Sequence, residues 1–422
     1  AEGQLLFSPS GFTLTTAALS NPSPALIVPF SAPQVAGTDF PVHIAAYGQT
    51  PNDPTCGIIE SYTGPRNLKF WQDTIDPVSG SVAATVDGVT VPATEAAAAD
   101  QSVTFTNGQA VVAGKYKDVG RIQISVKDDS QPHPDLPNGI RGATAGFVVK
   151  PYQFVLSNIE DSAGNPNPAA VDASGDAFVA AGEAFSVSVS AVDAEGDVTP
   201  NYGQESIPET VLLTSSLVAP AAGDNPAITS SFGPFVAGQA SGTTFSWPEV
   251  GIITLTPSVG DADYLGAGDV TGTTSGNVGR FYAHHFTTAL NTPTFATSCA
   301  AGSFTYIGET FDYSNEPVIT VTARALAGEI TENYDGAFFR INDASLPDPV
   351  YTSTPATLDT SGLPAGDPTI APTGAGPGTL TFGSGSGLFY TRTTEQAVFD
   401  ADIGLSIDVL DADGASASNP IV

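Results

Sequence analysis

Hydrophobic and polar residues alternate along many short stretches of the chain. The clearest stretch runs from Phe185 to Val192, where serines alternate with apolar residues. A period of two is typical of a β-strand with one face in a core and the other in water. Gly and Pro, with 44 and 34 residues, fall between such stretches and favour turns. No helical period is convincing; a helical turn is the alternative at Ala96–Ala99, but we expect these residues to belong to a loop. The pattern predicts an all-β chain.

Four short phrases recur three times in the same order. The first is a strand with an aromatic anchor: Phe12, Phe154 and Phe286. The second is a turn that leads into a strand: Gly37 to Phe40, Gly182 to Phe185 and Gly308 to Phe311. The third is a loop that holds a tyrosine: Ser61-Tyr62, Asn201-Tyr202 and Asn333-Tyr334. The fourth centres on Val119-Gly120, Val250-Gly251 and Ile403-Gly404, and we predict a tight hairpin there between the two final strands.

The threefold repeat sets the domain organisation. It predicts a tandem array of three immunoglobulin-like β-sandwich domains, at residues 1–146, 147–279 and 280–422, with boundaries near Gly146 and Gly279. The units are long for this sandwich type, and the excess lies in Gly-, Pro- and Asp-rich loops. In the first unit, Asn107-Gly108 between two β-rich runs predicts a further hairpin.

Composition narrows the classes of partner. The 422 residues include 44 acidic and 12 basic ones, for a net charge of −32. Such a chain would not neutralise phosphates, which disfavours nucleic acids and anionic membrane surfaces as partners. The sequence contains no run of about 18 apolar residues, so it predicts no membrane span. The chain contains no Met, which suggests a mature or trimmed form. We expect an extracellular or cell-surface location.

Two groups of phrases in the outer units carry a family resemblance. They are Tyr47 to Gly57 with Tyr62 to Gly64 and Leu68 to Trp71, and Gly279 to Phe286 with Cys299, Phe304 to Gly308 and Thr331 to Gly336. These phrases resemble the large region of uncharacterised function in MshQ-like proteins, which are encoded with the mannose-sensitive haemagglutinin (MSHA) type IV pilus. The resemblance spans most of the chain and implies a surface- or pilus-associated protein. The family's region continues beyond the equivalent of Val422, so we expect a fragment or a processed form.

Motifs for catalysis are missing from the sequence. There is no Gly-x-Ser-x-Gly elbow, Walker loop or His-Glu-x-x-His motif. We therefore expect that the protein is not an enzyme. His284 and His285 are neighbours, and side chains of adjacent strand residues point to opposite faces. We therefore expect that they do not share a metal ion.

Acidic turns are the candidate metal ligands. Calcium prefers six to eight oxygen ligands from clustered carboxylates and carbonyls. The turns that we single out hold Asp193, Glu195 and Asp197, and Asp408, Asp411 and Asp413. The alternative is that these residues are ordinary solvated turn formers. We expect no cofactor apart from this candidate calcium.

Two cysteines, Cys56 and Cys299, fall in the first and third units. A disulfide needs Cα atoms within about 7 Å. The options are thiols, a folded-back array that brings the two together, or a disulfide between neighbouring copies of the chain.

Three functions follow as hypotheses. The first is a non-enzymatic structural or adhesive array at the cell surface or on a pilus. The second is a self-assembling extracellular fibre subunit, joined head to tail by a disulfide or by strand donation, with Gln4–Phe7 and Ile421-Val422 as candidate donors. The third is a carbohydrate-binding adhesin module. The expected partners are copies of the chain, pilus or surface proteins, or glycans.

Overall fold

The structure is a computed structural model of the chain. It describes residues 10–21, 26–50, 53–78, 80, 82–130, 139–299, 304–343, 346, 349–363, 368–382 and 387–417. The candidate donors Gln4–Phe7 and Ile421-Val422 lie outside the described residues. Within these ranges the regular structure is strands and two short 3₁₀ turns, η1 (Glu95–Ala97) and η2 (Gly336–Phe338). The predicted all-β fold is confirmed. The loop expected at Ala96–Ala99 begins with the turn η1, which is a small correction.

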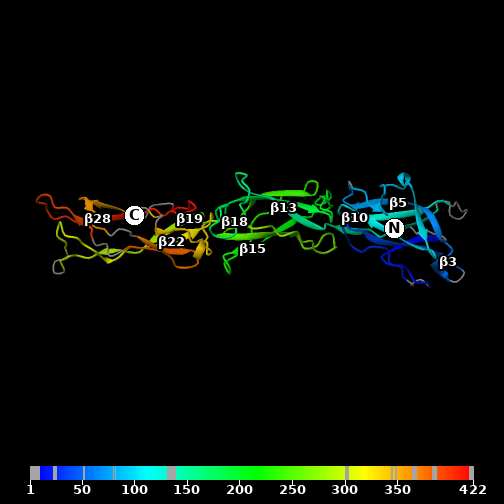
Figure 1. The fold of residues 1–422 in the computed structure, drawn as a ribbon, viewed down its shortest axis with the longest axis horizontal. Coiled ribbons are helices and arrows are strands. Elements are labelled where there is room, and N and C mark those ends of the chain that lie inside the picture. Colours follow the sequence, from blue (N-terminus) through cyan, green and yellow to red (C-terminus); the bar gives the residue numbers. More distant parts are fainter. Residues whose placement is uncertain are drawn as a thin grey trace, which may run out of the picture.

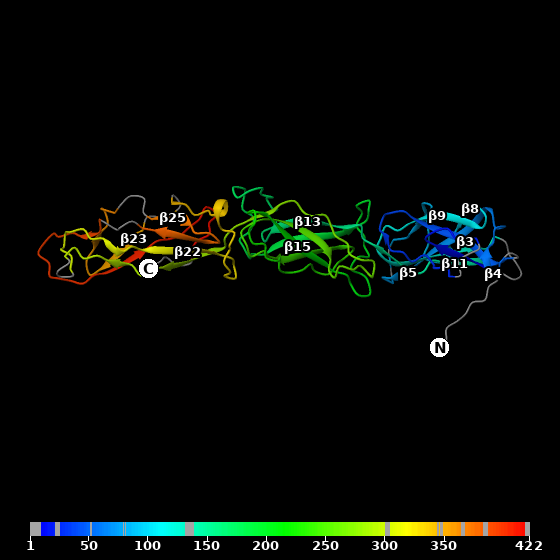
Figure 2. The same ribbon diagram turned by 90° about the horizontal axis from the view of Figure 1, so that it is seen from below.

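Three sandwiches follow one another along a straight rod (Figures 1 and 2). The chain is thus a tandem array of immunoglobulin-like domains, as predicted. We call the three domains the first, middle and third sandwich in chain order.

The first sandwich has two six-stranded sheets, ordered β1-β3-β9-β6-β7 with β4 beside β3, and β2-β12-β10-β5-β8 with β11 beside β10. Its strands are β1 (Ser10–Thr15), β2 (Gln34–Val35), β3 (Phe40–Thr50), β4 (Asp53–Ile58), β5 (Gly64–Asp76), β6 (Thr85–Val86), β7 (Val89–Thr90), β8 (Asp100–Phe105), β9 (Gln109–Lys115), β10 (Gly120–Asp128), β11 (Ile140–Ala143) and β12 (Phe147–Lys150).

The middle sandwich packs the sheet β13-β14-β16 on the sheet β15-β17-β18. Its strands are β13 (Gln153–Asp161), β14 (Phe185–Val192), β15 (Val211–Ala219), β16 (Gln239–Phe245), β17 (Gly251–Val259) and β18 (Val278–Phe281). Along β14 the apolar side chains Phe185, Val187 and Val189 are buried and the serines between them are half-buried, as the alternation predicts.

The third sandwich has a four-stranded sheet, β19-β22-β26-β25, and the pairs β20-β21, β23-β28 and β24-β27. Its strands are β19 (His285–Leu290), β20 (Thr294–Phe295), β21 (Tyr313–Asn315), β22 (Val318–Arg324), β23 (Val350–Thr354), β24 (Leu358–Asp359), β25 (Thr369–Pro372), β26 (Pro377–Thr381), β27 (Phe389–Tyr390) and β28 (Asp402–Ser406). Sheet membership changes between Lys150 and Gln153 and between Phe281 and His285. The domain division at residues 1–146, 147–279 and 280–422 stays a proposal.

The fourth repeated phrase is not a hairpin. Its flanking strands β9 and β10 belong to opposite sheets, as do β16 and β17. The phrase therefore crosses from one sheet of the sandwich to the other, and we call it the crossover. The Asn107-Gly108 turn does form, with both residues at positive φ, but the strands on either side of it, β8 and β9, also enter opposite sheets. The hairpin prediction for the crossover was therefore wrong, whereas the one for Asn107-Gly108 holds at the turn itself, where Thr106 and Gln109 pair antiparallel and exchange both backbone hydrogen bonds.

The hydrophobic cores run through both domain junctions. One cluster joins the core of the first sandwich to Phe154, Tyr202 and Tyr264 of the middle one. A second joins Val250 and Ile252 of the middle sandwich to the core of the third. Because apolar surface is buried across each junction, bending there would expose it to water. The packing favours a stiff rod.

Candidate functional site

The first two crossovers each carry one buried acid that binds the next domain. Asp118 Oδ1 accepts a hydrogen bond from the backbone N–H of Asn201 at 3.0 Å, and it also accepts one from Val119 N–H. In the second junction, Glu249 Oε1 accepts from the backbone N–H of Asn333 at 3.1 Å. Both acids are buried. The crossover acid and the Asn of the tyrosine loop thus form the same contact twice.

Burial controls the titration of these two acids. It raises the pKa of Asp118 to about 6, against the backbone hydrogen bonds from Asn201 and Val119, which lower it. It raises the pKa of Glu249 to about 7, against the backbone hydrogen bonds from Val250 and Asn333. Removal from water disfavours a carboxylate, and N–H donors only partly offset that cost.

The second repeated phrase also touches the next domain. Ala194 N–H donates to Ala36 carbonyl and Leu326 N–H donates to Ala181 carbonyl, each at 2.9 Å. The glycines that follow, Gly37 and Gly182, have φ of 77° and 82°. A Cβ atom on Gly37 would come within 2.9 Å of Ala194 N, and one on Gly182 within 3.1 Å of Leu326 N. Glycine is therefore required at both positions by backbone conformation and by close approach.

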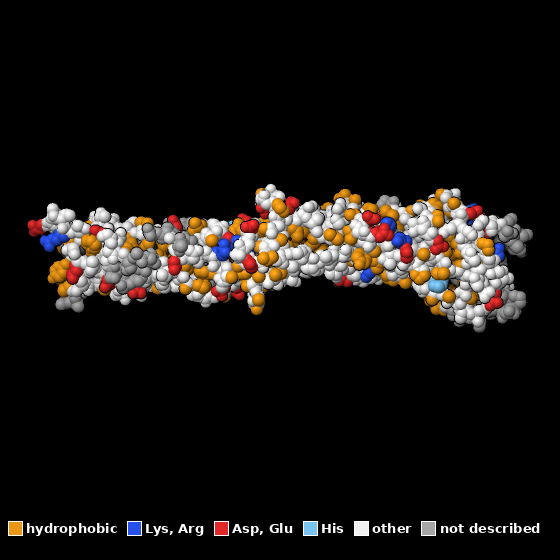
Figure 3. Space-filling model, in the orientation of Figure 1, with side chains coloured by type: hydrophobic (Ala, Val, Ile, Leu, Met, Phe, Trp, Pro, Cys, Tyr) orange, Lys and Arg blue, Asp and Glu red, His pale blue; other side chains and the backbone are white. Residues whose placement is uncertain are grey.

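Charged side chains add to each junction. At the first, Lys115 and Lys117 of the first sandwich pair with Glu195 of the middle one, and Figure 3 shows basic and acidic side chains together in this region. At the second, the Arg280 guanidinium forms a bidentate pair with Asp413, in which Nη1 lies 2.7 Å from Oδ2. Arg280 and Asp413 are both buried. A bidentate buried pair fixes orientation as well as distance.

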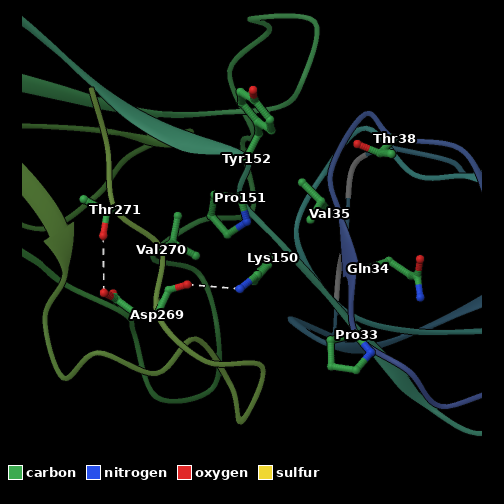
Figure 4. Close-up of a pocket in the computed structure, with 10 residues that line it drawn as sticks. All are labelled: Pro33, Gln34, Val35, Thr38, Lys150, Pro151, Tyr152, Asp269, Val270 and Thr271. Atoms are coloured by element: carbon green, nitrogen blue, oxygen red, sulfur yellow. Dashed lines mark hydrogen bonds between the residues drawn. The ribbon is translucent and has the colours of Figure 1, made fainter. Parts of the chain in front are cut away.

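A groove of about 390 Å³ opens beside the first junction (Figure 4). Lys150 reaches across it, and its Nζ donates to the carbonyl of Asp269 at 3.0 Å. Thr271 donates to the Asp269 carboxylate, and Tyr152 is exposed at the rim. The cation of the groove is thus used to hold the first and middle sandwiches together.

A larger cavity, about 590 Å³, lies in the third sandwich at its end away from the middle one. We call it the distal cavity. Its lining includes Phe295, Phe304, Tyr306, Phe311, Tyr390 and Ile403. Tyr306 is 61% exposed and Val398, also on the lining, is 97% exposed. Figure 3 shows hydrophobic side chains gathered at this end of the rod. Exposed apolar patches of this kind mark interaction surfaces.

The acidic turns selected from the sequence lie at the two junctions. Asp193 Oδ1 accepts from the N–H groups of Glu195 and Asp197, and Asp411 Oδ1 accepts from those of Asp413 and Ala415. Glu195 and Asp413 are paired with lysine and arginine as described. Asp408 is exposed. Among the described residues, no three His, Cys, Asp or Glu side chains are grouped so that they could hold a metal ion.

Calcium binding by these turns stays a prediction, and thermal unfolding tests it. If calcium stiffens the array, excess EDTA lowers the melting temperature, because a ligand that binds only the folded state stabilises it. Calcium restored in excess of EDTA returns the melting temperature to its first value. An unchanged melting temperature rejects the prediction.

The cysteines and histidines are placed as follows. Cys56 is exposed on β4 of the first sandwich, and Cys299 is half-buried in the third, in a bridge with Phe304. The straight array keeps these two domains apart, so the chain is not folded back to bring Cys56 and Cys299 together. A disulfide between copies of the chain stays a prediction. The two histidine rings pack edge to face, with 3.0 Å between their Nδ1 atoms. The opposite-face expectation was wrong because His284 precedes β19 and is not part of a regular strand.

Three family models together match most of the chain. The model for the domain of unknown function DUF6701, first Ig-like domain, matches residues 1–138. Those for the DUF6701 second and third domains match residues 150–245 and 249–421. The third match begins before β17 and β18, which pair within the middle sandwich. No curated protein sequence matches the chain.

Among solved structures, the chain is similar to the bacterial integrin-binding protein invasin, at 11% identity and a TM-score of 0.27 over 95% of this chain. It spans 57% of that structure. A fragment of intimin in complex with the intimin-binding domain of its translocated receptor is 14% identical, with a TM-score of 0.27, over 63% of this chain and 66% of that one. InvD of Yersinia pseudotuberculosis is 12% identical, with a TM-score of 0.25, over 98% and 97%.

Proposed function

The chain belongs to the DUF6701 family, and we propose that it is a non-enzymatic spacer and adhesive rod on the outside of the cell. The observation that carries this proposal is the continuous hydrophobic core through both junctions. A stiff rod holds its last domain at a fixed distance from its point of attachment. In this proposal the distal cavity is the contact surface and the first two sandwiches are the stalk.

The charge of the rod bears on which partners it can bind. The net charge of −32 makes copies repel one another except where complementary surfaces meet. Among the described residues, no helix is both long enough and apolar enough to cross a membrane. The partners that fit are pilus or other surface proteins, or a second copy of the chain. The pilus of the MSHA type is the specific attachment that we propose.

Immunogold electron microscopy of intact cells tests the location. Antibody raised against the full chain is expected to label the outside of the cell or its pili, because the proposal places the rod there. The matched control is a strain from which the coding sequence has been deleted, which should lose the label. Label that appears only after the cells are permeabilised contradicts the proposal.

A carbohydrate-binding adhesin is the second candidate. The distal cavity favours this candidate because exposed aromatic side chains, such as those of Tyr306 and Phe304, can stack on sugar rings. A glycan array probed with the full chain separates this candidate from the first.

A further inference from the structure

Two neighbouring histidines lie at the second junction, and the proposed function gives them no part. The rings of His284 and His285 stand at 89° to each other, with 3.0 Å between the two Nδ1 atoms. Both residues are half-buried, so part of each side chain reaches solvent. The expectation that they do not share a metal ion rested on a regular strand, and that strand begins only at His285. The fold thus brings two imidazole nitrogens together at the surface of the rod.

The backbone fixes the places from which the two rings meet. The N–H of His284 donates to the Arg324 carbonyl at 2.9 Å. His285 begins β19, where it lies opposite Arg324 of β22. The residues on either side of the pair, Ala283 and Phe286, are fully buried. Because the backbone is paired and its neighbours are packed, the close approach of the two rings is a property of the folded chain.

A carboxylate of the middle sandwich faces the other nitrogen of His284. Glu183 Oε1 lies 3.8 Å from His284 Nε2. A neutral imidazole carries one proton, and a carboxylate beside Nε2 favours the tautomer that holds the proton there. Nδ1 of His284 then presents a lone pair toward His285. Metal-binding histidines have this same arrangement, in which a carboxylate beside the outer ring nitrogen orients the ring.

The spacing of the two Nδ1 atoms fits two uses. In the first, His285 Nδ1–H donates a hydrogen bond to His284 Nδ1. In the second, His285 also carries its proton on Nε2, and both Nδ1 atoms bind one metal ion. At metal–nitrogen distances of about 2.0–2.1 Å, a spacing of 3.0 Å gives an N–metal–N angle of about 95°. That angle suits the square-planar and tetragonal geometry of Cu²⁺, whereas tetrahedral Zn²⁺ needs about 109°.

We propose that His284 and His285 bind one Cu²⁺ ion through their Nδ1 atoms at the second junction. Cu²⁺ is also the divalent ion of its row that nitrogen ligands bind most tightly. Among the described residues no third His, Cys, Asp or Glu side chain is grouped with these two, so water molecules fill the remaining coordination positions. Glu183 is a positioning residue, which acts through the tautomer of His284.

Charges near the pair are compatible with a bound cation. Glu183 supplies a negative charge on the side of the middle sandwich. Arg324 is a cation on the strand that faces His285, but its guanidinium donates to Thr287 and Gly328. The chain as a whole carries a net charge of −32, which favours the approach of cations.

Copper titration of the full chain tests the site. Electron paramagnetic resonance follows the titration, because the splitting of the Cu²⁺ signal by nitrogen counts the nitrogens bound to the ion. The wild-type chain is expected to bind one ion with two nitrogens, above the background given by the double variant His284→Gln/His285→Gln. His285→Gln removes a ligand and should weaken binding by about a hundredfold. Glu183→Gln keeps both nitrogens, and the loss expected from the changed tautomer preference is about tenfold.

The matched control is His43→Gln, which removes a histidine of β3 in the first sandwich and should bind Cu²⁺ as the wild type does. Melting temperatures measured in EDTA check that each variant is folded, and His284→Gln carries the same expectation if His285→Gln is not. Wild-type binding no stronger than that of the double variant overturns the site. Full binding by a folded single-histidine variant overturns the pair as the ligands. Wild-type affinity in Glu183→Gln overturns the positioning role of Glu183.

Discussion

Replacing Arg280 with alanine is expected to lower the stability of the second junction by about 3–5 kcal/mol. Arg280 lies on β18 of the middle sandwich and its guanidinium holds Asp413 of the third through two hydrogen bonds. Its Nε also donates to the carbonyl of Gly175. Without the arginine, Asp413 stays in a buried place, with Arg340 Nε at 3.6 Å as its remaining cationic partner. A buried acid that has lost its bidentate partner is the costly outcome of breaking such a pair.

Differential scanning calorimetry measures this effect. The Arg280→Ala chain should unfold its third sandwich in a separate transition at lower temperature. The matched control is Arg324→Ala, because Arg324 donates to Thr287 and Gly328 within the third sandwich at exposed sites and its loss should cost little. Arg280→Lys keeps the charge without the planar fork, and an intermediate loss is expected. A calorimetric profile for Arg280→Ala that matches that of Arg324→Ala would contradict the coupling role.

The repeat predicted the fold because strand periodicity and turn residues are local signals. The burial of alternate residues in β14 follows from the sequence directly. Periodicity does not determine which sheet a strand joins, because two strands of one hairpin and two strands in opposite sheets have the same period of two. That is why the crossover at Val119-Gly120 was interpreted as a hairpin. The pairing depends on contacts distant in the sequence.

The candidate site was only partly visible in the sequence. Asp193 and Asp411 stood out because they fall in acidic turns, whereas Asp118 and Glu249 were overlooked as ordinary polar residues near a glycine. The signal that could have found them is their equal position: both stand two residues before the glycine of the fourth phrase. Where another domain follows in the described structure, as in the first two crossovers, this carboxylate is buried with a fixed partner, whereas its counterpart Asp402 is exposed. The hydrogen-bond partner, the backbone N–H of Asn201 or Asn333, belongs to another domain, and the sequence does not indicate this pairing.

The second large effect expected is a loss of stability at the second junction as the pH rises. Burial raises the pKa of Glu249 from its ordinary value of 4.5 to about 7. Between these two pH values the folded chain holds a proton that the unfolded chain has released, so the free energy of unfolding falls as the pH increases. The stabilisation is complete below about pH 4.5 and is lost by about pH 7, at up to about 1.4 kcal/mol per pH unit. Across the window the loss is about 3 kcal/mol.

Other buried acids change stability in the same direction, so a difference between variants is the informative quantity. Burial also raises the pKa of Asp118, Glu209 and Asp411. Glu249→Gln removes one titrating group and should flatten the pH profile of denaturant unfolding between pH 4.5 and 7 relative to the wild type. Glu332→Gln removes the same charge from an exposed position beside Asn333, and its profile should run parallel to the wild type. If the Glu249→Gln profile is also parallel to that of the wild type, Glu249 does not hold its proton in the folded rod. The junction then contains a buried carboxylate that its N–H donors are sufficient to stabilise.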